Sequence, residues 1–210
     1  MSAGVVLIGG GGHAKVVIES LRASGKTVAV IVDADSTPRE VLGVPVVGDD
    51  LALPGLKAQG FSELFVALGS NRLRQKLGVK ARELGFTLVN AIHPSAVISP
   101  SARIGEGVAV MASVAINADS RIGDLAIINT GAVVDHDCDL GAACHLGPAS
   151  ALAGGVTIGE RAFLGVGARV IPGVRIGADT ILGAGGVVVR DLPDAVVAIG
   201  VPAQIKGERS

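Results

Sequence analysis

An aliphatic residue recurs at every sixth position from Ile92 to Val188, through seventeen successive hexads. A period of six fits neither an α-helix nor a single alternating strand, so each hexad must combine one short strand with one turn. The residue four positions after each aliphatic one is nearly always small, as a narrow interior requires. Three hexads then close one triangular coil, and residues eighteen apart stack. The pattern predicts a parallel β-helix over residues 92–192.

Glycine directly follows the aliphatic residue in many hexads. We interpret this glycine column as the bends of each coil, where a residue without a Cβ atom costs least. The column contains Gly105, Gly123, Gly141, Gly147, Gly159, Gly165, Gly177 and Gly183.

Residues 1–91 lack the hexad pattern and predict a separate, Rossmann-like α/β domain. Residues 5–8 read as a buried strand that runs into the glycine-rich turn 9–12 and then into a helix. A second strand, 27–32, ends at Asp33, and a third, 63–68, ends at Gly69. Because ligands bind outside the carboxyl ends of parallel strands, these loops predict a nucleotide site. The alternative is a tight turn that needs glycine whether or not a phosphate binds there.

Two further segments lie outside these patterns. Residues 38–53 are rich in turn signals and are interpreted as connecting structure. Residues 193–210 follow the last hexad and are predicted to form a C-terminal tail.

Composition supports this division and excludes several partners. Aromatic residues make up only 2% of the chain, and a net charge of −1 with no basic run argues against nucleic acid or a membrane surface as partner. No apolar run approaches the roughly 20 residues of a membrane span. The start of the chain shows no secretory leader, so we expect a cytoplasmic protein. The cysteines, Cys138 and Cys144, fall in the small inward column and are predicted to be buried, with a disulfide or a nucleophile as the alternative.

Polar residues interrupt the hexad pattern in one segment. Asn129, His136, Asp137 and His145 cluster there. His136 lies outside both inward columns, so it is expected to face solvent or a neighbouring subunit. Gly154, eighteen residues later, is expected to leave an empty space over the imidazole that a substrate could occupy. The alternative is an ordinary surface histidine.

These motifs resemble a known family. The hexads resemble those of the hexapeptide-repeat acyltransferases, whose repeats form a left-handed β-helix. The turn Gly-Gly-Gly-His-Ala-Lys followed by Val-Asp-His-Asp-Cys in the repeat is similar to the bacterial nucleotide-linked amino-sugar N-acetyltransferases, over essentially the whole chain. That group includes enzymes acting on GDP-perosamine and on UDP-linked 4-amino sugars of the bacillosamine pathway. The resemblance implies an acetyl-CoA-dependent enzyme that acetylates the 4-amino group of a 4,6-dideoxysugar linked to GDP or UDP, as a step of polysaccharide or O-antigen biosynthesis.

The resemblance also implies roles in catalysis and in acetyl-CoA binding. His136 matches the general base of the family and Asp137 its acidic partner. His145 matches a histidine near the thioester and Gly154 a backbone amide near the thioester carbonyl. Val166 and Ala184 match positions whose backbone groups bind the pantetheine arm of acetyl-CoA in the family.

For the nucleotide sugar, the resemblance implies contacts from Gly11, Gly12, His13, Asp33 and Gly69, with Asn129 beside the base. It implies a homotrimer with the active site between neighbouring β-helices. No metal is expected, because the four histidines show no closely spaced ligand cluster. Two alternatives remain at this point, namely a sugar O-acetyltransferase of the sialic acid type and a non-catalytic structural hexapeptide trimer.

Overall fold

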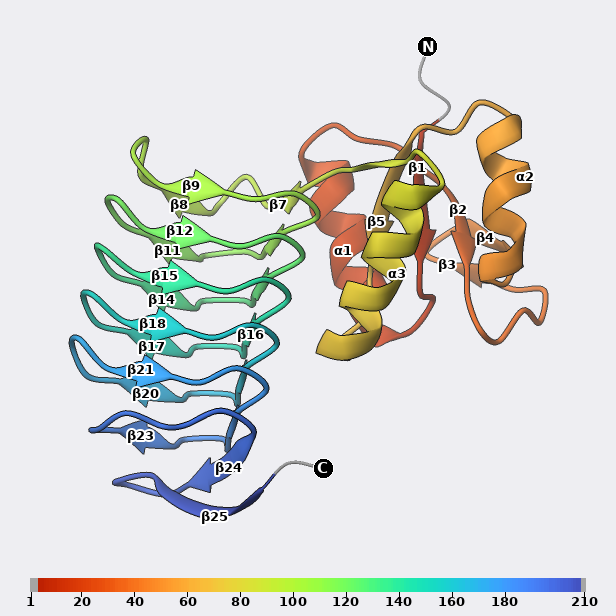
Figure 1. Ribbon diagram of the computed structural model, residues 1–210. Coiled ribbons are helices and arrows are strands. Elements are labelled where there is room, and N and C mark those ends of the chain that lie inside the picture. The colour runs from red at the N-terminus through yellow and green to blue at the C-terminus, as the bar shows by residue number, and fades with distance from the viewer. Residues whose placement is uncertain (1–3, 209–210) are drawn as a thin grey trace.

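The computed structural model describes residues 4–208, which form an α/β domain beside a triangular β-helix (Figure 1). The α/β domain has one sheet of order β3-β4-β2-β1-β5-β6, parallel except for the β3–β4 pair. Its strands are β1 (Val5–Ile8), β2 (Val28–Val32), β3 (Glu40–Val41), β4 (Val44–Gly48), β5 (Glu63–Val66) and β6 (Thr87–Leu88). Its helices are α1 (Gly12–Ala23), the short 3-10 helix η1 (Asp50–Ala52), α2 (Leu53–Ala58) and α3 (Asn71–Glu83).

Helices cover both faces of this sheet, and β1 shows why. Its alternating residues Val5 and Leu7 pack on the side of α1, whereas Val6 and Ile8 pack on the side of α2 and α3. All four are at most 3% exposed. Because β1 is buried on both faces, every one of its positions is apolar, which explains the continuous apolar run in the sequence.

The prediction that residues 38–53 only connect other elements is wrong. This segment contains β3, β4 and η1, and β4 pairs parallel with β2. Val44 and Val46 are buried while the residues between and after them are not, so an alternation of period two is present. Frequent glycine and proline concealed it.

The β-helix contains a two-residue strand at every hexad from β7 to β23, and the second residue of each strand is the repeating aliphatic residue. The strands stack into three parallel faces. The first face contains β7 (Ala91–Ile92), β10 (Ala109–Val110), β13 (Ile127–Ile128), β16 (His145–Leu146), β19 (Phe163–Leu164) and β22 (Ile181–Leu182). The second contains β8 (Val97–Ile98), β11 (Ala115–Ile116), β14 (Val133–Val134), β17 (Ala151–Leu152), β20 (Arg169–Val170) and β23 (Val187–Val188). The third contains β9 (Arg103–Ile104), β12 (Arg121–Ile122), β15 (Asp139–Leu140), β18 (Thr157–Ile158) and β21 (Arg175–Ile176).

The interpretation of the glycine column as bends is wrong. A Cβ atom on Gly141 would lie 2.6 Å from the backbone nitrogen of Glu160, in the next coil, and glycine is therefore required by the close stacking of coils. In most hexads a left-handed turn residue falls two positions later. There the residue is often not glycine, as with Asp137 at a φ of 59°.

The segment after the last hexad extends the β-helix. Strand β24 (Val196–Ile199) pairs parallel with β22 on the first face, and β25 (Gln204–Glu208) pairs antiparallel with β24. Leu192, Ala198 and Ala203 belong to the same core as the hexads. This strand pair covers the open end of the prism (Figure 1).

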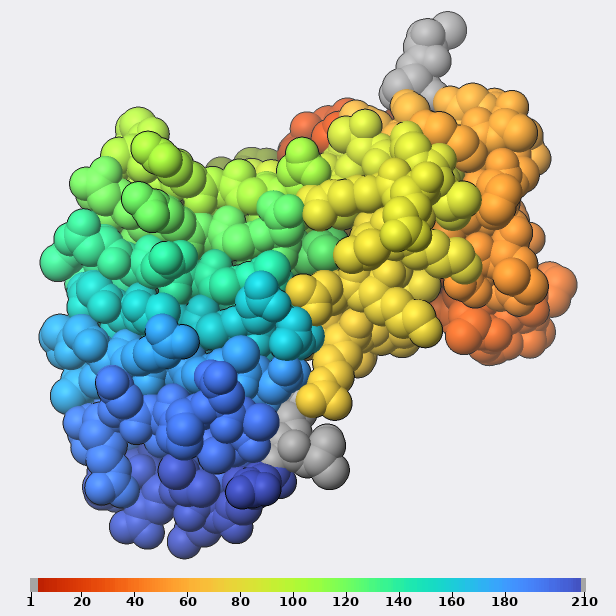
Figure 2. Space-filling model, in the orientation of Figure 1, coloured from red at the N-terminus to blue at the C-terminus, as the bar shows by residue number. Residues whose placement is uncertain are grey.

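The two domains pack tightly along the first face of the β-helix. Helix α1 covers Ala109 and Ile127, whose side chains point outward from the prism and are at most 1% exposed. Helix α3, yellow in Figure 2, lies against the neighbouring corner. There Gly78 approaches Leu125 so closely that a Cβ atom would lie 2.5 Å from Leu125 Cδ1. None of the helices within residues 4–208 is long and apolar enough to cross a membrane.

This contact predicts opposite effects for two glycine-to-alanine substitutions in helices. We expect Gly78→Ala to lower the free energy of unfolding by about 2 kcal/mol, because it overpacks the interface with Leu125. The matched change Gly55→Ala, in α2, meets no atom within 4 Å and should raise it by about 0.5–1 kcal/mol through helix propensity. Urea unfolding of both variants measures this. Equal stabilisation by both changes would contradict the close packing of α3.

Candidate active site

His136 and Asp137 lie at the corner between the second and third faces, with one residue between them and the end of β14. Asp137 adopts the left-handed turn conformation, which aspartate tolerates better than most residues. The turn brings its carboxylate back to the preceding side chain, so that Asp137 Oδ2 lies 2.8 Å from His136 Nδ1. The side chains are 60% and 66% exposed. Two residues adjacent in sequence thus form a histidine–carboxylate pair that faces outward.

Two carboxylates increase the basicity of this histidine. The hydrogen bond to Asp137 and the charge of Asp135 raise the pKa of His136. Asp135 is held by Asn117 Nδ2 at 2.9 Å and accepts the backbone N–H of His136 at 2.8 Å. Because Nδ1 is engaged by Asp137, the neutral ring presents the lone pair of Nε2, as a general base requires.

Gly154 lies one coil beyond His136, and the imidazole packs against it. A Cβ atom at Gly154 would lie 2.5 Å from His136 Cε1 and 2.6 Å from Nε2. The prediction of an empty space over the imidazole is therefore wrong, because the ring itself occupies that space. The Gly154 N–H donates to no acceptor within residues 4–208, so this amide remains available beside the base.

His145 and Asn129 lie elsewhere, where the first face meets the α/β domain. His145 is 9% exposed and packs edge-on against Phe163, with ring centroids 5.1 Å apart. Its Nε2 lies 3.2 Å from Asn129 Nδ2. Burial, with the charge of Arg74 and of His13, lowers the pKa of His145 to about 3. His145 is therefore neutral at physiological pH and can position a ligand without exchanging protons.

The glycine turn shows which of its residues the fold requires. Gly9 has a φ of 103°, and its missing Cβ gives room to Leu68. By contrast, Cβ atoms on Gly11 and Gly12 would meet no atom within 4 Å. Packing within the chain does not explain these two glycines, which favours close approach by a ligand to the N-terminus of α1.

His13 follows this turn in the first turn of α1. Its Nε2 is buried and has no hydrogen-bond partner in the described part of the chain. Burial and the charge of Arg74 lower the pKa of His13 to about 4. A buried, unpaired ring nitrogen is costly, and a ligand or water can satisfy it.

Asp33 supports the glycine turn directly. Its carboxylate accepts the N–H of Gly10 at 2.5 Å and that of Asp35 at 2.9 Å, and it pairs with Arg39 at 3.2 Å. Burial opposes ionisation, but these hydrogen bonds prevail and lower the pKa of Asp33. Gly69, which follows β5 at the neighbouring strand end, leaves the space beside it open. Its backbone lies near His145 and slightly opposes the lowering of the His145 pKa.

Val166 and Ala184 stack at the corner between the first and second faces, after β19 and β22. Both are exposed. The Val166 carbonyl accepts the N–H of Gly185, but the N–H groups of Val166 and Ala184 find no acceptor among residues 4–208. The corner therefore offers two amides, one coil apart, to an extended ligand.

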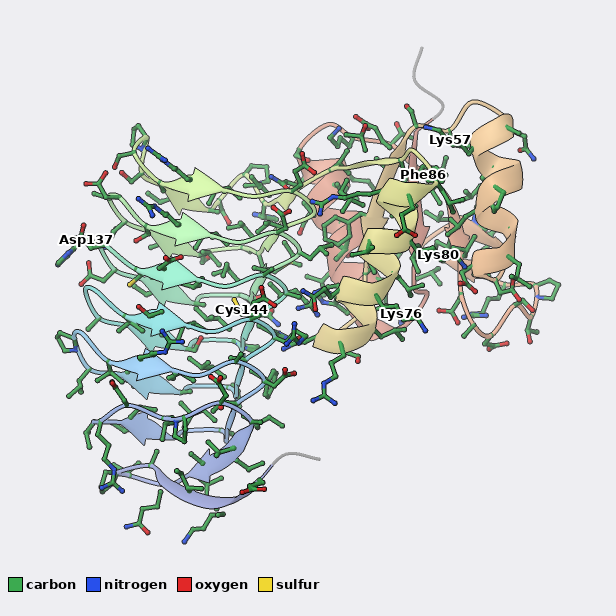
Figure 3. All side chains as sticks on the ribbon, in the orientation of Figure 1. Lys57, Lys76, Lys80, Phe86, Asp137 and Cys144 are labelled. Atoms are coloured by element: carbon green, nitrogen blue, oxygen red, sulfur yellow. The ribbon has the colours of Figure 1, made fainter. Side chains whose placement is uncertain are left out.

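The expected site residues thus fall into two groups in one chain. One group joins the α/β domain to the first–second corner and contains Gly11, Gly12, His13, Asp33, Gly69, Asn129, His145, Val166 and Ala184. The other, at the second–third corner, contains His136, Asp137 and Gly154. Figure 3 shows Asp137 on the side of the prism away from the α/β domain. The second face of the β-helix lies between the two groups.

Neither cysteine belongs to these groups. Cys138 and Cys144 are free and buried in the prism, and burial raises the pKa of both thiols. Within residues 4–208, no group of three or more histidine, cysteine or acidic side chains is arranged to hold a metal ion.

Comparison with known proteins assigns the family. A model of the PglD N-terminal domain matches residues 4–80. The crystal structure of PerB from Caulobacter crescentus, in complex with CoA and GDP-perosamine, is 84% identical in sequence, covers 97% of this chain and 97% of that chain, and superposes with a TM-score of 0.95. This chain belongs to the hexapeptide-repeat sugar N-acetyltransferases. As in that family, its β-helix is left-handed.

Other members of the family are more distant. The acetyltransferase domain of PglB from Neisseria gonorrhoeae FA1090, in complex with acetyl coenzyme A, is 42% identical, with 98% of this chain and 100% of that chain covered and a TM-score of 0.91. The UDP-N-acetylbacillosamine N-acetyltransferase of Bacillus subtilis (strain 168) is 42% identical over 113 residues, 51% of this chain and 51% of that protein. The chain thus matches about half the length of this curated relative.

Sequence reasoning missed Arg74, the largest fully buried side chain among residues 4–208. It links the two domains by donating to the carbonyls of Leu125 at 2.7 Å, Leu68 at 2.9 Å and Ala143 at 2.8 Å. Its acceptors are backbone carbonyls and the amide oxygen of Asn71, without a carboxylate. Burial lowers the pKa of Arg74 to about 10, so the side chain stays charged at neutral pH. The only sequence signal was the helical spacing of Arg74 with the small residues Gly78 and Ala81, which are buried on the same face of α3.

The contacts of Arg74 predict a large difference between two arginines of α3. We expect Arg74→Met to lower the free energy of unfolding by about 3 kcal/mol, because several buried carbonyls lose their donor. Arg72→Met removes a side chain that is 54% exposed and pairs with Asp179, and should cost less than about 1 kcal/mol. Denaturant unfolding with matched m-values tests this. Similar losses in both variants would contradict the role assigned to Arg74.

Proposed function

We propose that this chain transfers the acetyl group of acetyl-CoA to the 4-amino group of a GDP-linked 4-amino-4,6-dideoxysugar, with GDP-perosamine as the substrate to test first. The observation that carries the proposal is the 84% identity, over 97% of both chains, to a protein whose structure contains CoA and GDP-perosamine. The outward-facing His136–Asp137 pair supports the same chemistry.

In the proposed reaction, the sugar amine attacks the thioester carbonyl and forms the new C–N bond. His136 Nε2 accepts a proton from the nitrogen, and the negative charge of Asp137 stabilises the resulting imidazolium. The unpaired N–H of Gly154 is suited to hydrogen-bond the oxyanion of the tetrahedral intermediate. Collapse of the intermediate breaks the C–S bond, and the CoA thiolate leaves and receives a proton.

The binding roles follow the two groups of residues. We infer that the nucleotide phosphates bind the N–H groups of Gly11 and Gly12 at the start of α1, and that the pantetheine arm lies along the amides of Val166 and Ala184. Gly69 borders the nucleotide site. Asp33 contributes mainly by fixing the glycine turn, since its oxygens accept from Gly10 and Asp35.

The place where the nucleotide sugar meets the thioester of acetyl-CoA is assigned to His13, Asn129 and His145. The unpaired Nε2 of His13 supports this assignment, as does the contact between Asn129 and His145. Because burial keeps His145 neutral, its proposed role is to orient the ligands.

We further infer that a complete site needs two copies of the chain. The base group and the binding group lie on opposite sides of the second face, whose outward residues include the exposed apolar Val97 and Val133. If copies associate through this face, His136 of one copy approaches the binding group of the next. A homotrimer closes such an arrangement by threefold symmetry. The trimer and the cytoplasmic location both remain predictions.

The first experiment measures CoA release from acetyl-CoA with GDP-perosamine, a UDP-linked 4-amino sugar and free sialic acid as acceptors. We expect rapid release with GDP-perosamine and a loss of about 10²-fold or more in His136→Ala. Reaction with sialic acid alone would favour O-acetylation instead. An undiminished His136→Ala variant would remove the assigned base.

The raised pKa of His136 predicts a specific pH dependence. The base acts when unprotonated, so kcat/KM should rise with pH through the pKa of His136. Asp137→Asn removes the carboxylate that raises this pKa, so the acid limb should move to lower pH and the plateau should fall. Asp139→Asn, an acidic residue on the adjacent strand, serves as the control and should keep the parent profile. The assignment fails if Asp137→Asn leaves the acid limb in place.

A shared site predicts complementation between inactive variants. His136→Ala lacks the base, and Gly12→Asp places a negative charge in the open space at the phosphate site. Mixed trimers should regain about a quarter of the parent activity, because random assortment pairs an intact base group with an intact binding group at one site in four. The two variants are denatured, mixed, refolded and assayed, with each refolded variant alone as the control. No recovery from a correctly refolded trimer would mean that each copy forms its site alone.

A further inference from the structure

A cavity of about 330 Å³ lies between α3 and the carboxyl ends of β1 and β2. It borders Gly9 of the glycine turn and Asp33, because β2 and β5 flank β1 in the sheet. In open parallel sheets, this crevice is where ligands bind. With the phosphates at the glycine turn, the nucleoside of the substrate can extend into it.

The walls of this cavity are mostly aliphatic. Val32 lines one side, Leu68 follows β5 by two residues, and Leu73 and Leu77 lie one turn apart on α3. Leu73 is 45% exposed. A flat ring held between these side chains would remove apolar surface from water, as ligand pockets generally do.

Besides Asp33, three charged side chains line this cavity, namely Asp50, Lys76 and Lys80. Asp50, at the start of η1, accepts a hydrogen bond from Lys80 at 2.6 Å. Figure 3 labels Lys80 and Lys76 on consecutive turns of α3. Lys76 hydrogen-bonds to no atom of residues 4–208, and its positive charge adds to the lowering of the Asp50 pKa. The hydrogen bond from Lys80 lowers the pKa of Asp50, so the carboxylate is ionised at neutral pH and still has lone pairs to offer.

We propose that this cavity binds the guanine base of the nucleotide and that Asp50 and Lys76 select guanine over other bases. The proposal rests on the proposed function for the position of the phosphates. Asp50 accepts the N1–H and 2-amino groups of guanine, and Lys76 donates to its O6 atom.

The order of donors and acceptors on the base edge explains the selectivity. Guanine has two adjacent N–H donors beside one carbonyl, which matches an acceptor-only carboxylate beside a donor-only ammonium. Uracil has one N–H between two carbonyls, so one of its carbonyls would face the carboxylate. Adenine presents an acceptor nitrogen where guanine has N1–H. A site of fixed polarity rejects such analogues because its own polar groups lose their partners.

Calorimetric binding of GDP, IDP and UDP to the full chain tests the proposal. IDP differs from GDP only by lacking the 2-amino group. The parent should bind GDP about tenfold more tightly than IDP and about 10²-fold more tightly than UDP. Asp50→Asn should weaken GDP binding by about 10- to 100-fold and bring the GDP-to-IDP ratio close to one.

Two matched variants separate selection from general damage. Asp49→Asn changes the neighbouring acid, which caps η1 through the Leu51 N–H; asparagine also caps, so GDP and IDP affinities should stay as in the parent. Lys76→Met should weaken both ligands by a similar factor, about tenfold, because both carry O6. Parent-like GDP and IDP affinities in Asp50→Asn would overturn the proposal.

The outcome can be separated from that of the proposed function. If the chain acetylates a UDP-linked amino sugar and binds UDP at least as tightly as GDP, the guanine assignment falls and acetyl transfer stands. If GDP binds with the expected selectivity but no amino sugar is acetylated, the guanine assignment stands and the proposed function falls.

Discussion

The stacking of coils at a repeat of eighteen residues is the constraint on which the rest of this protein depends. Each short strand satisfies its backbone only by pairing with the coils before and after it, as β13 does with β10 and β16. Close stacking in turn excludes a Cβ atom at positions such as Gly141. Because every coil repeats the same geometry, each corner becomes a fixed column. A polar residue in such a column has a defined place without a loop to hold it.

The catalytic corner uses this rigidity. In most hexads the left-handed turn position serves only the fold, but at Asp137 it also directs a carboxylate to the preceding histidine. Gly154 then receives the imidazole from the coil above. The left-handed turn therefore places Asp137 beside the proposed base. The close stacking of coils and the absence of a side chain at Gly154 place the imidazole of His136 beside an unpaired backbone amide.

The candidate site was predictable in its residues more than in its arrangement. His136 and Asp137 could be recognised because they break a regular pattern. Their separation from His13 and His145 could not, since a hexad pattern does not say which face an attached domain will cover. Arg74 escaped notice for a related reason. Its partners are backbone carbonyls of Leu68, Leu125 and Ala143, which carry no signature in the sequence.

The sequence by itself determined the β-helix, because a strict period of six with alternating large and small inward residues admits few other structures. It also determined the position of the glycine turn, because a strand followed by four glycines must bend there. Only the tertiary structure decided that β3 and β4 extend the first sheet and that the β-helix core continues through β24. It also decided that Arg74 joins the two domains. These features depend on contacts between distant segments, and such contacts leave no periodic trace in the chain.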